Sequence, residues 1–404
     1  MNKYIKYTLV AFIAVVFLTG VFSSGFVVGH FTSSGLFGNL LSAPSSDTSD
    51  DLQTLFVPFW ESWKLVHQKY VDQPLDDTKL MRGAIQGMLA SLGDAHTSYM
   101  DPVQYKDENS FLAGSYEGIG AFVDTTGEYL SIVSPMKGSP ALKAGLKSGD
   151  KIMKIDGKDM KGIPGELVRQ KVLGPAGTDV TLTILRGSDD PFDVTVTRAK
   201  ITIPSVEGKM LDSGIAHVQI NTFGDTTTQE LRSTLKDLLA QKPKGLVVDL
   251  RNNGGGYLDT AVEVSSEFIG SGVILYEKYG DGTIKEFKAI SGGLATDIPI
   301  IVLVNEGSAS ASEIVAGALQ DAGRAKLVGV TTYGKGSVQE WLPLSENQGA
   351  VRITIAKWLT PLKRTIDKLG LTPDVVVEMT ADDYTAGRDP QLDAAVKTLL
   401  EMIK

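Results

Sequence analysis

The sequence contains no cysteine and only four histidines. Without cysteine, the chain can form no disulfide bond, no thiolate nucleophile and no cysteine-bound zinc site. His96 follows Asp94 closely, a spacing more typical of a structural turn than of a catalytic triad. None of the histidines has the His-Glu-x-x-His spacing that holds a catalytic zinc ion, so we expect no metal site. The four are His30, His67, His96 and His217.

Positive charge is also in short supply. The chain has 39 Lys and Arg residues against 48 Asp and Glu residues, a net charge of −9. A nucleic-acid-binding surface needs a basic stripe that neutralises phosphates, and the sequence has none, so we expect no nucleic-acid partner. What remains is an ordinary globular composition of 404 residues, 42% hydrophobic and 22% charged. That length predicts about two or three domains.

Residues 1–30 combine a basic start with a long apolar run. Lys3 and Lys6 precede an uncharged stretch, residues 7–29, that is long enough to cross a bilayer. The basic flank predicts that the amino end stays inside and that the rest of the chain lies outside the cytoplasm, anchored in the cell envelope or periplasm. The alternative is a cleaved signal peptide, favoured by small residues over 20–25, which would make the protein secreted.

Two regions of different composition follow. Residues 31–50 are rich in Ser, Gly and Asp and predict a flexible linker. Residues 51–112 carry apolar residues at helical spacing and predict an N-terminal helical region. We expect the aromatic stripe of this region to pack in a core, with a homodimer contact as the alternative. The stripe consists of Phe59, Trp63, Val66 and Tyr70.

Residues 113–200 hold several short strand patterns separated by turn signals, with two short helices between them. Glycines near the start would let the backbone approach a ligand closely, and backbone N–H groups can bind a carboxylate without any side-chain charge. The alternative is that these glycines only bend a strand. The segment consists of Tyr116, Glu117, Gly118, Ile119 and Gly120.

Residues 201–404 alternate between strand and helix patterns, which predicts an α/β region. A buried strand over 245–250 runs into the glycine-rich turn Arg251-Asn252-Asn253-Gly254-Gly255-Gly256. A second buried strand over 298–304 ends in a small-residue turn and then a helix start. That helix start carries Ser308, Ser310 and Ser312.

Lys335 follows in a Gly-Lys-Gly turn. A serine at a helix start together with this lysine fits a serine nucleophile with a lysine base. The simpler alternatives are a helix cap and a solvated turn residue. A phosphate-binding loop from Gly329 to Lys335 is a third alternative, but Gly336 stands where Ser or Thr should bind magnesium. The alternating pattern after it also predicts a strand and not a helix.

The stretch GSASASEIVAGALQDAGRAKLVGVTTYGKGSVQE closely resembles the signature of the carboxyl-terminal processing (tail-specific) proteases, a serine-lysine family designated S41. The resemblance implies that Ser310 is the nucleophile, Lys335 the general base, and Gln339 the residue that holds the lysine amine. DLRNNGGG resembles a second segment of the family. It implies an oxyanion hole formed by the N–H of Gly254 or Gly255 and the N–H of Ala311.

The stretches YEGIGAFV, SPALKAGLKSGDKIMKIDGKDM and GTDVTLTILR resemble a PDZ domain. PDZ domains bind the last residues of a peptide as an added strand. The resemblance implies that residues 116–120 hold the terminal carboxylate. Arg169, on the second helix, either is solvated or bridges to the catalytic core. Lys363 stands where the family often has glycine, so we expect the loop there to differ in shape.

Together these patterns predict an α/β multidomain protein with an N-terminal helical region, an inserted β-rich PDZ domain over 113–200 and a catalytic sheet-and-helix core over 201–404. The expected function is a membrane-anchored serine endopeptidase outside the cytoplasm. Its expected substrates are proteins or peptides with free carboxyl ends, cut through an acyl-enzyme without a cofactor. The alternative is an inert, membrane-tethered PDZ module that only binds peptides.

Overall fold

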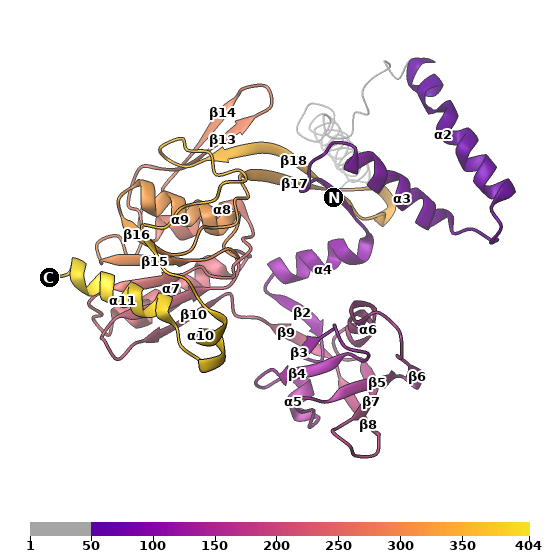
Figure 1. Ribbon diagram of the computed structural model, residues 1–404, viewed down its shortest axis with the longest axis horizontal. Coiled ribbons are helices and arrows are strands. Elements are labelled where there is room, and N and C mark those ends of the chain that lie inside the picture. The colour runs from indigo at the N-terminus through magenta and orange to yellow at the C-terminus, as the bar shows by residue number, and fades with distance from the viewer. Residues whose placement is uncertain (1–49) are drawn as a thin grey trace, which may run out of the picture. The chain divides into compact units, whose positions relative to one another are not determined.

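The structure is a computed structural model that describes residues 50–404 (Figure 1). The predicted membrane segment over 7–29 and nearly all of the predicted linker lie outside these residues. Within the part of the chain that is described, no helix is long and apolar enough to cross a membrane. The chain divides into two compact units, residues 1–80 and 81–404.

The first unit contains α2 (Asp50–Lys69). Helix α3 (Asp77–Ala90) begins in the last residues of this unit and continues into the second. The hydrogen bond from His67 to Asp77, 2.6 Å long, joins the two helices. The predicted core role of the aromatic stripe is wrong, because Val66 is 39% exposed and Tyr70 is 52% exposed. The rings of Phe59 and Trp63 contact each other, and both residues are half-buried.

The predicted PDZ region forms its own antiparallel sheet in the order β3-β4-β5-β7-β8, with β6 paired to β5. Alternating residues of these strands point into one apolar cluster with Ala141 and Val168 of the two helices. The elements are β3 (Ala121–Asp124), β4 (Ser131–Pro135), α5 (Pro140–Lys143), β5 (Lys151–Ile155), β6 (Lys158–Asp159), α6 (Gly165–Val172), β7 (Asp179–Leu185) and β8 (Phe192–Thr197). A separate pair, β2 (Ser115–Gly118) with β9 (Ala199–Thr202), brackets the region.

A second six-stranded sheet is mostly parallel, in the order β10-β11-β12-β15-β16-β19, with only β10 antiparallel. Its central strands are apolar on both faces because helices cover both. Residues of α7, α8 and α9 pack on one face, and α11 packs on the other. The bounds are β10 (Val206–Met210), β11 (Ala216–Ile220), α7 (Thr227–Leu239), β12 (Leu246–Asp249), α8 (Leu258–Ser266), β15 (Ile300–Val304), α9 (Ala311–Asp321), β16 (Ala325–Gly329), β19 (Val375–Val376), α10 (Ala381–Ala386) and α11 (Pro390–Met402).

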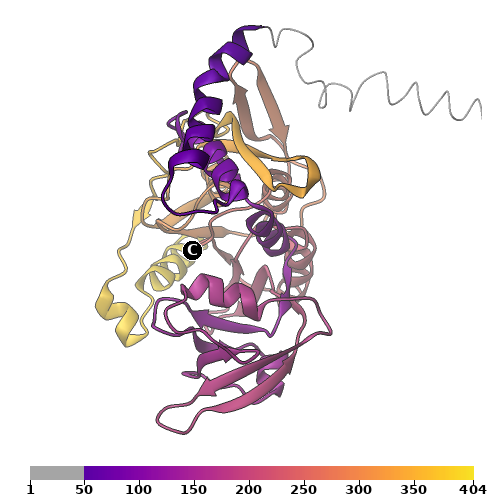
Figure 2. The same cartoon turned by 90° about the vertical axis from the view of Figure 1, so that its right-hand side faces the viewer.

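A third, antiparallel sheet has the order β1-β18-β13-β14, with β17 paired to β18. Strands β17 and β18 form a long hairpin in which the two strands lie side by side in both views (Figures 1 and 2). Strand β1 comes from before the PDZ region and adds to β18. The bounds are β1 (Ser98–Met100), α4 (Pro102–Leu112), β13 (Val273–Tyr279), β14 (Ile284–Lys288), β17 (Ser337–Pro343), η1 (Ser345–Asn347) and β18 (Ala350–Leu359).

The predicted α/β multidomain fold is therefore confirmed, with its helical start, its β-rich insert and its sheet-and-helix core. The loop at Lys363 keeps a conformation that suits glycine, since Lys363 has a φ of 58°. The Lys363 N–H donates to the carbonyl of Thr360 at 2.7 Å, and its amine lies 5.1 Å from the ring of Tyr276. These contacts hold a lysine in the left-handed region.

Candidate functional site

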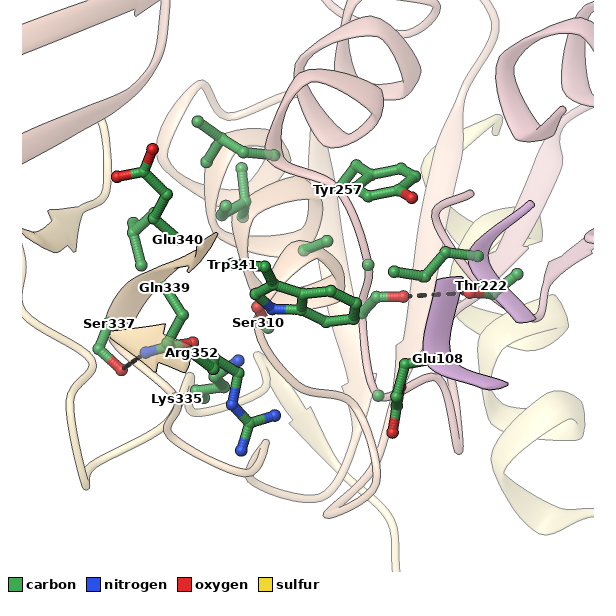
Figure 3. Close-up of a pocket in the computed structure, with 18 of the residues that line it drawn as sticks. Glu108, Thr222, Tyr257, Ser310, Lys335, Ser337, Gln339, Glu340, Trp341 and Arg352 are labelled. Carbon is green, nitrogen blue, oxygen red and sulfur yellow. Dashed lines mark hydrogen bonds between the residues drawn. The ribbon is translucent and has the colours of Figure 1, made fainter. Parts of the chain in front are cut away.

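A pocket of about 720 Å³ opens where the glycine-rich turn after β12, the start of α9 and the β17–β18 hairpin meet. Figure 3 shows Ser310, Lys335 and Gln339 around it. Helix α4, which precedes the PDZ region in the sequence, adds Tyr105 and Glu108 to the lining. All six predicted residues of the catalytic centre and the oxyanion hole line this pocket: Ser310, Lys335, Gln339, Gly254, Gly255 and Ala311.

Ser310 has an unusual backbone conformation at the end of the turn that leads into α9. Its φ of 55° and ψ of −114° lie outside the regions that L-residues prefer, which costs on the order of 1–3 kcal/mol. The helix begins immediately after it. The serine therefore stands at the positive end of the α9 dipole, beside N–H groups that have no partner within the helix.

The other two serines of the run have structural roles. Ser308 is fully buried and donates its hydroxyl to the carbonyl of Leu250 at 2.8 Å. Ser312 is also fully buried and donates to the carbonyl of Asn253 at 2.8 Å. Both bonds tie the start of α9 to the turn after β12. Of the three hydroxyls, only that of Ser310 lines the pocket.

The two candidate glycines of the turn differ in their hydrogen bonding. The Gly255 N–H donates to the Asn253 side chain at 2.9 Å. Within residues 50–404, the N–H groups of Gly254 and Ala311 donate to no other residue. Gly255 has a φ of +105°, and a Cβ there would lie 2.8 Å from the Cβ of Ser310. Gly255 thus gives the turn its close approach to Ser310, and Gly254 keeps the unpaired donor.

The glycine-rich turn is anchored from the side opposite the pocket. The Arg251 guanidinium bonds the Asp249 carboxylate at 2.7 Å and the Asp389 carboxylate at 2.9 Å. Asp389 caps α11, so this pair joins the C-terminal helix to the turn. Although burial opposes its charge, the hydrogen bonds that it donates to both carboxylates raise the pKa of Arg251. His217 on β11 also bonds Asp249, at 3.1 Å.

Lys335 is half-buried between two glycines whose backbone lies close to residues 366–370. A Cβ on Gly336 would lie 2.6 Å from the backbone nitrogen of Asp367. Burial and then the positive charge of Arg352 lower the pKa of Lys335 to about 8, while the carboxylates of Glu313 and Asp94 act in the opposite direction. A substantial share of the amine is therefore neutral near physiological pH.

Glu313, which the sequence analysis did not single out, connects the two candidate residues. It is fully buried, and one carboxylate oxygen accepts from the backbone N–H groups of Ser310 and Lys335, both at 2.9 Å. The other oxygen accepts from the Thr332 hydroxyl and from Gly334. Burial raises the pKa of Glu313, against the effect of these hydrogen bonds. The spacing Ser-x-x-Glu at a helix start was the available signal.

A second pocket of about 570 Å³ lies in the PDZ region. Four of the five predicted carboxylate-binding residues line it: Tyr116, Glu117, Ile119 and Gly120. Gly118 does not, because it packs inward, where a Cβ would lie 2.9 Å from the side chain of Leu173. Gly120 has a φ of +74°, and a Cβ there would lie 2.5 Å from Ser139. These two glycines are needed for packing as well as for any ligand.

Arg169 lines this second pocket from α6. Its guanidinium lies 3.9 Å from the Asp107 carboxylate on α4. The bridge therefore reaches the helix that precedes the PDZ region. That helix lines both pockets, with Tyr105 at the first and Lys106 at the second.

Comparison with known proteins gives three family matches. A model of peptidase family S41 matches residues 214–377, and a PDZ-domain model matches residues 131–186. A third, described as the N-terminal domain of the activating protease CtpB, matches residues 41–103. The three matches correspond to the sheet-and-helix core, the PDZ region and the helical region, respectively.

The chain is also similar to named proteins. It is 40% identical to a carboxy-terminal-processing protease of Bartonella bacilliformis, covering 91% of this chain and 85% of that one. It is 36% identical to the carboxy-terminal processing protease CtpA of Bacillus subtilis, covering 94% and 79%. A solved S41 protease structure from Bacteroides fragilis shares the fold, with a TM-score of 0.54 at 17% identity over 84% of this chain and 96% of that one.

Proposed function

Because this chain belongs to the carboxy-terminal processing proteases of peptidase family S41, we propose that it cuts peptide bonds with Ser310 as nucleophile and Lys335 as general base. The chain is a serine peptidase with a PDZ domain. One observation carries the assignment of the two residues. Ser310, at the positive end of α9, and Lys335, with its pKa lowered to about 8, line one pocket.

Each step follows from the groups in the pocket. Neutral Lys335 accepts the Ser310 proton while the serine oxygen attacks the carbonyl carbon of the peptide bond. The oxyanion binds the N–H groups of Ala311 and Gly254, each worth about 3–4 kcal/mol in such sites. Lysine then gives its proton to the leaving amine, and the acyl-enzyme remains. Lys335 next takes a proton from water, which attacks the ester, and returns that proton to the Ser310 oxygen as the acid product leaves.

The substrates are proteins or peptides, and we propose that they are recognised by a free carboxyl end. The relatives are named for carboxy-terminal processing. In the PDZ pocket, backbone around Ile119 and Gly120 would bind the terminal carboxylate, as such domains do. Apolar side chains beside it, including Leu130 and Val172, suit an apolar last residue.

We also propose that the enzyme acts outside the cytoplasm, held at a membrane by residues 7–29. The support is the sequence alone: a basic flank followed by an apolar run of spanning length. A homodimer through α2 completes the proposal. Its support is the exposed apolar surface of that helix, on which Trp60 is 61% exposed and Leu55 is 70% exposed.

The test is cleavage of a flexible tailed protein by the purified chain, followed by mass spectrometry of the new carboxyl ends. Ser310→Ala and Lys335→Ala should each abolish product. Ser345→Ala and Lys326→Ala, at exposed positions away from the pocket, are the matched controls and should cut normally. Wild-type protein that binds the tail and never cuts it would instead establish the inert PDZ module. Product from Ser310→Ala would exclude Ser310 as the nucleophile.

A further inference from the structure

The segment around Asp94, remote in sequence from the catalytic residues, lies against the hairpin that carries Gln339. Strand β1 pairs with β18 so that Ser98 lies opposite Arg352. The Arg352 side chain donates to the carbonyl of His96 at 3.0 Å. The backbone N–H of Thr354 donates to the Thr97 hydroxyl at 3.1 Å. Across the hairpin, Thr354 lies opposite Gln339.

Asp94 is the acceptor at the end of a chain of hydrogen bonds. Its carboxylate accepts from the backbone N–H of His96 at 3.0 Å and from the Thr97 hydroxyl at 2.6 Å, which confirms the predicted turn. The Thr354 hydroxyl is its second side-chain partner. Burial opposes the charge, but the hydrogen bonds from Thr354 and Thr97 prevail and lower the pKa of Asp94 to about 2. Asp94 is therefore ionised at neutral pH.

The direction of each bond in this chain follows from the ionised carboxylate, which can only accept. Thr354 has one hydroxyl proton and directs it to Asp94, so its oxygen is left to accept. The Gln339 amide nitrogen fills that place at 3.1 Å and donates its other hydrogen to Ser337 at 2.8 Å (Figure 3). Both amide hydrogens are then used.

The carbonyl oxygen of Gln339 is the last group of this series of hydrogen bonds and has no partner assigned so far. Among residues 50–404 it accepts no hydrogen bond, and Gln339 lines the same pocket as Lys335. We propose that Asp94 is a positioning residue that acts through Thr354 to keep the Gln339 carbonyl directed at the Lys335 amine. The inference rests on the proposed Ser310–Lys335 mechanism and adds the reason why Gln339 offers oxygen and not nitrogen.

The amide orientation matters because Lys335 has only donors when charged and one lone pair when neutral. A carbonyl oxygen accepts a lysine hydrogen in both states and leaves the lone pair free for the Ser310 proton. A reversed amide would direct N–H groups at the lysine, repel its cation and compete for that lone pair. Without an ionised Asp94, the Thr354 hydroxyl is free to donate to Gln339, and the reversed amide becomes as good as the present one.

The first test is a double-mutant cycle between Thr354→Val and Gln339→Ala. Thr354→Val should lower kcat roughly tenfold with little change in KM, since it removes one hydrogen bond that holds the amide. In the Gln339→Ala background the same substitution should cost almost nothing, because the residue it acts through is gone. Effects that multiply in full would overturn the inference.

Two further variants separate positioning from stability. Thr354→Ser keeps the hydroxyl and should restore most of the lost kcat. Thr228→Val removes a bond of the same kind, from Thr228 to Glu263 at 2.6 Å, at the surface of α7. It should leave kcat unchanged. A Thr354→Ser enzyme as slow as Thr354→Val, with an unaltered thermal melt, contradicts a role for the hydroxyl.

Asp94→Asn adds a readout that a merely structural turn would not move. The groups that act on Lys335 are Arg352 from β18, Glu313 from α9 and Asp94; His96 interacts with it as well. Because the Asp94 charge raises the pKa of Lys335, the asparagine should shift the pH profile of kcat/KM to lower pH and reduce its plateau. If Asp94→Asn leaves both the pH profile of kcat/KM and its plateau unchanged, the inference about Asp94 is wrong. The proposed Ser310–Lys335 mechanism would still hold in that case, provided that Ser310→Ala and Lys335→Ala are inactive.

Discussion

The two pockets of this protein are built in opposite ways. Residues 116, 117, 119 and 120 of one short segment line the PDZ pocket together with parts of α4 and α6, and the carboxylate binding proposed there would use backbone N–H groups and no charged side chain. The catalytic pocket joins α4, the turn after β12, the start of α9 and the β17–β18 hairpin. It depends on charged groups such as Lys335 and Glu313 that burial perturbs. The proposed recognition would therefore rest largely on the backbone of one segment, whereas the proposed catalysis would depend on side chains that tertiary assembly brings together.

The largest effect should come from replacing the buried amine. Lys335→Arg keeps the positive charge but cannot lose its proton, so kcat should fall on the order of 10⁴-fold or more. Peptide binding to the PDZ pocket should not change. The measurements are proteolysis and fluorescence-detected binding by protein whose thermal melt matches the wild type. Cleavage at more than a tenth of the normal rate would show that Lys335 is not the base.

Glu313→Gln should be next in size, and it tests whether one carboxylate holds both catalytic segments. Glutamine keeps one acceptor oxygen and turns an N–H₂ group toward donors, so at least one buried donor loses its partner. The free energy of unfolding should fall by about 1–3 kcal/mol, with a large loss of kcat. Glu306→Gln changes an exposed residue in the turn that precedes α9. It is the matched control, measured by denaturant unfolding and by activity. Equal stability and activity in both variants contradict the role given to Glu313.

The pH dependence distinguishes the pockets without a mutation. In the proposed mechanism the neutral form of Lys335 is the active one, so kcat/KM should rise with pH and level off above the lysine pKa of about 8. At pH 6 the neutral fraction, and hence the rate, should be roughly a hundredfold below the plateau. Affinity of the PDZ pocket for a tailed peptide, measured by calorimetry over the same range, should stay nearly flat. A flat rate profile between pH 6 and 9 would remove the neutral-lysine step.

The smallest effect should come from amidating the carboxyl end of the substrate. The amide removes the charge that the backbone N–H groups near Gly120 would bind. The loss should be about 1–3 kcal/mol of affinity, the value of one or two charge-assisted hydrogen bonds. At saturating substrate, kcat should hardly change, because the catalytic pocket is untouched. Equal affinity of the free acid and the amide would exclude a carboxylate site.

Much of the architecture could be read from local pattern. The short strand patterns within residues 113–200 became the PDZ sheet, and the buried run over 298–304 became β15 because such apolar strands need cover on both faces. The aromatic stripe of α2 shows the limit of this reasoning. Helical spacing marks an apolar face, but whether Tyr70 is buried depends on what packs against it, and 52% of the residue is exposed.

The sequence alone supplies the candidate reactive groups and turns: a serine at a helix start, a lysine between glycines, a glycine-rich turn after a buried strand, and no thiol at all. Which of these groups lie close enough to act together depends on the folded structure. It buried Ser308 and Ser312 in structural bonds, occupied the Gly255 N–H, and placed Asp94 and Glu313 against the lysine. The physical reason is that a hydrogen bond or a pKa shift depends on distance and burial in space, and spacing along the chain reports these only within a helix, a strand or a turn.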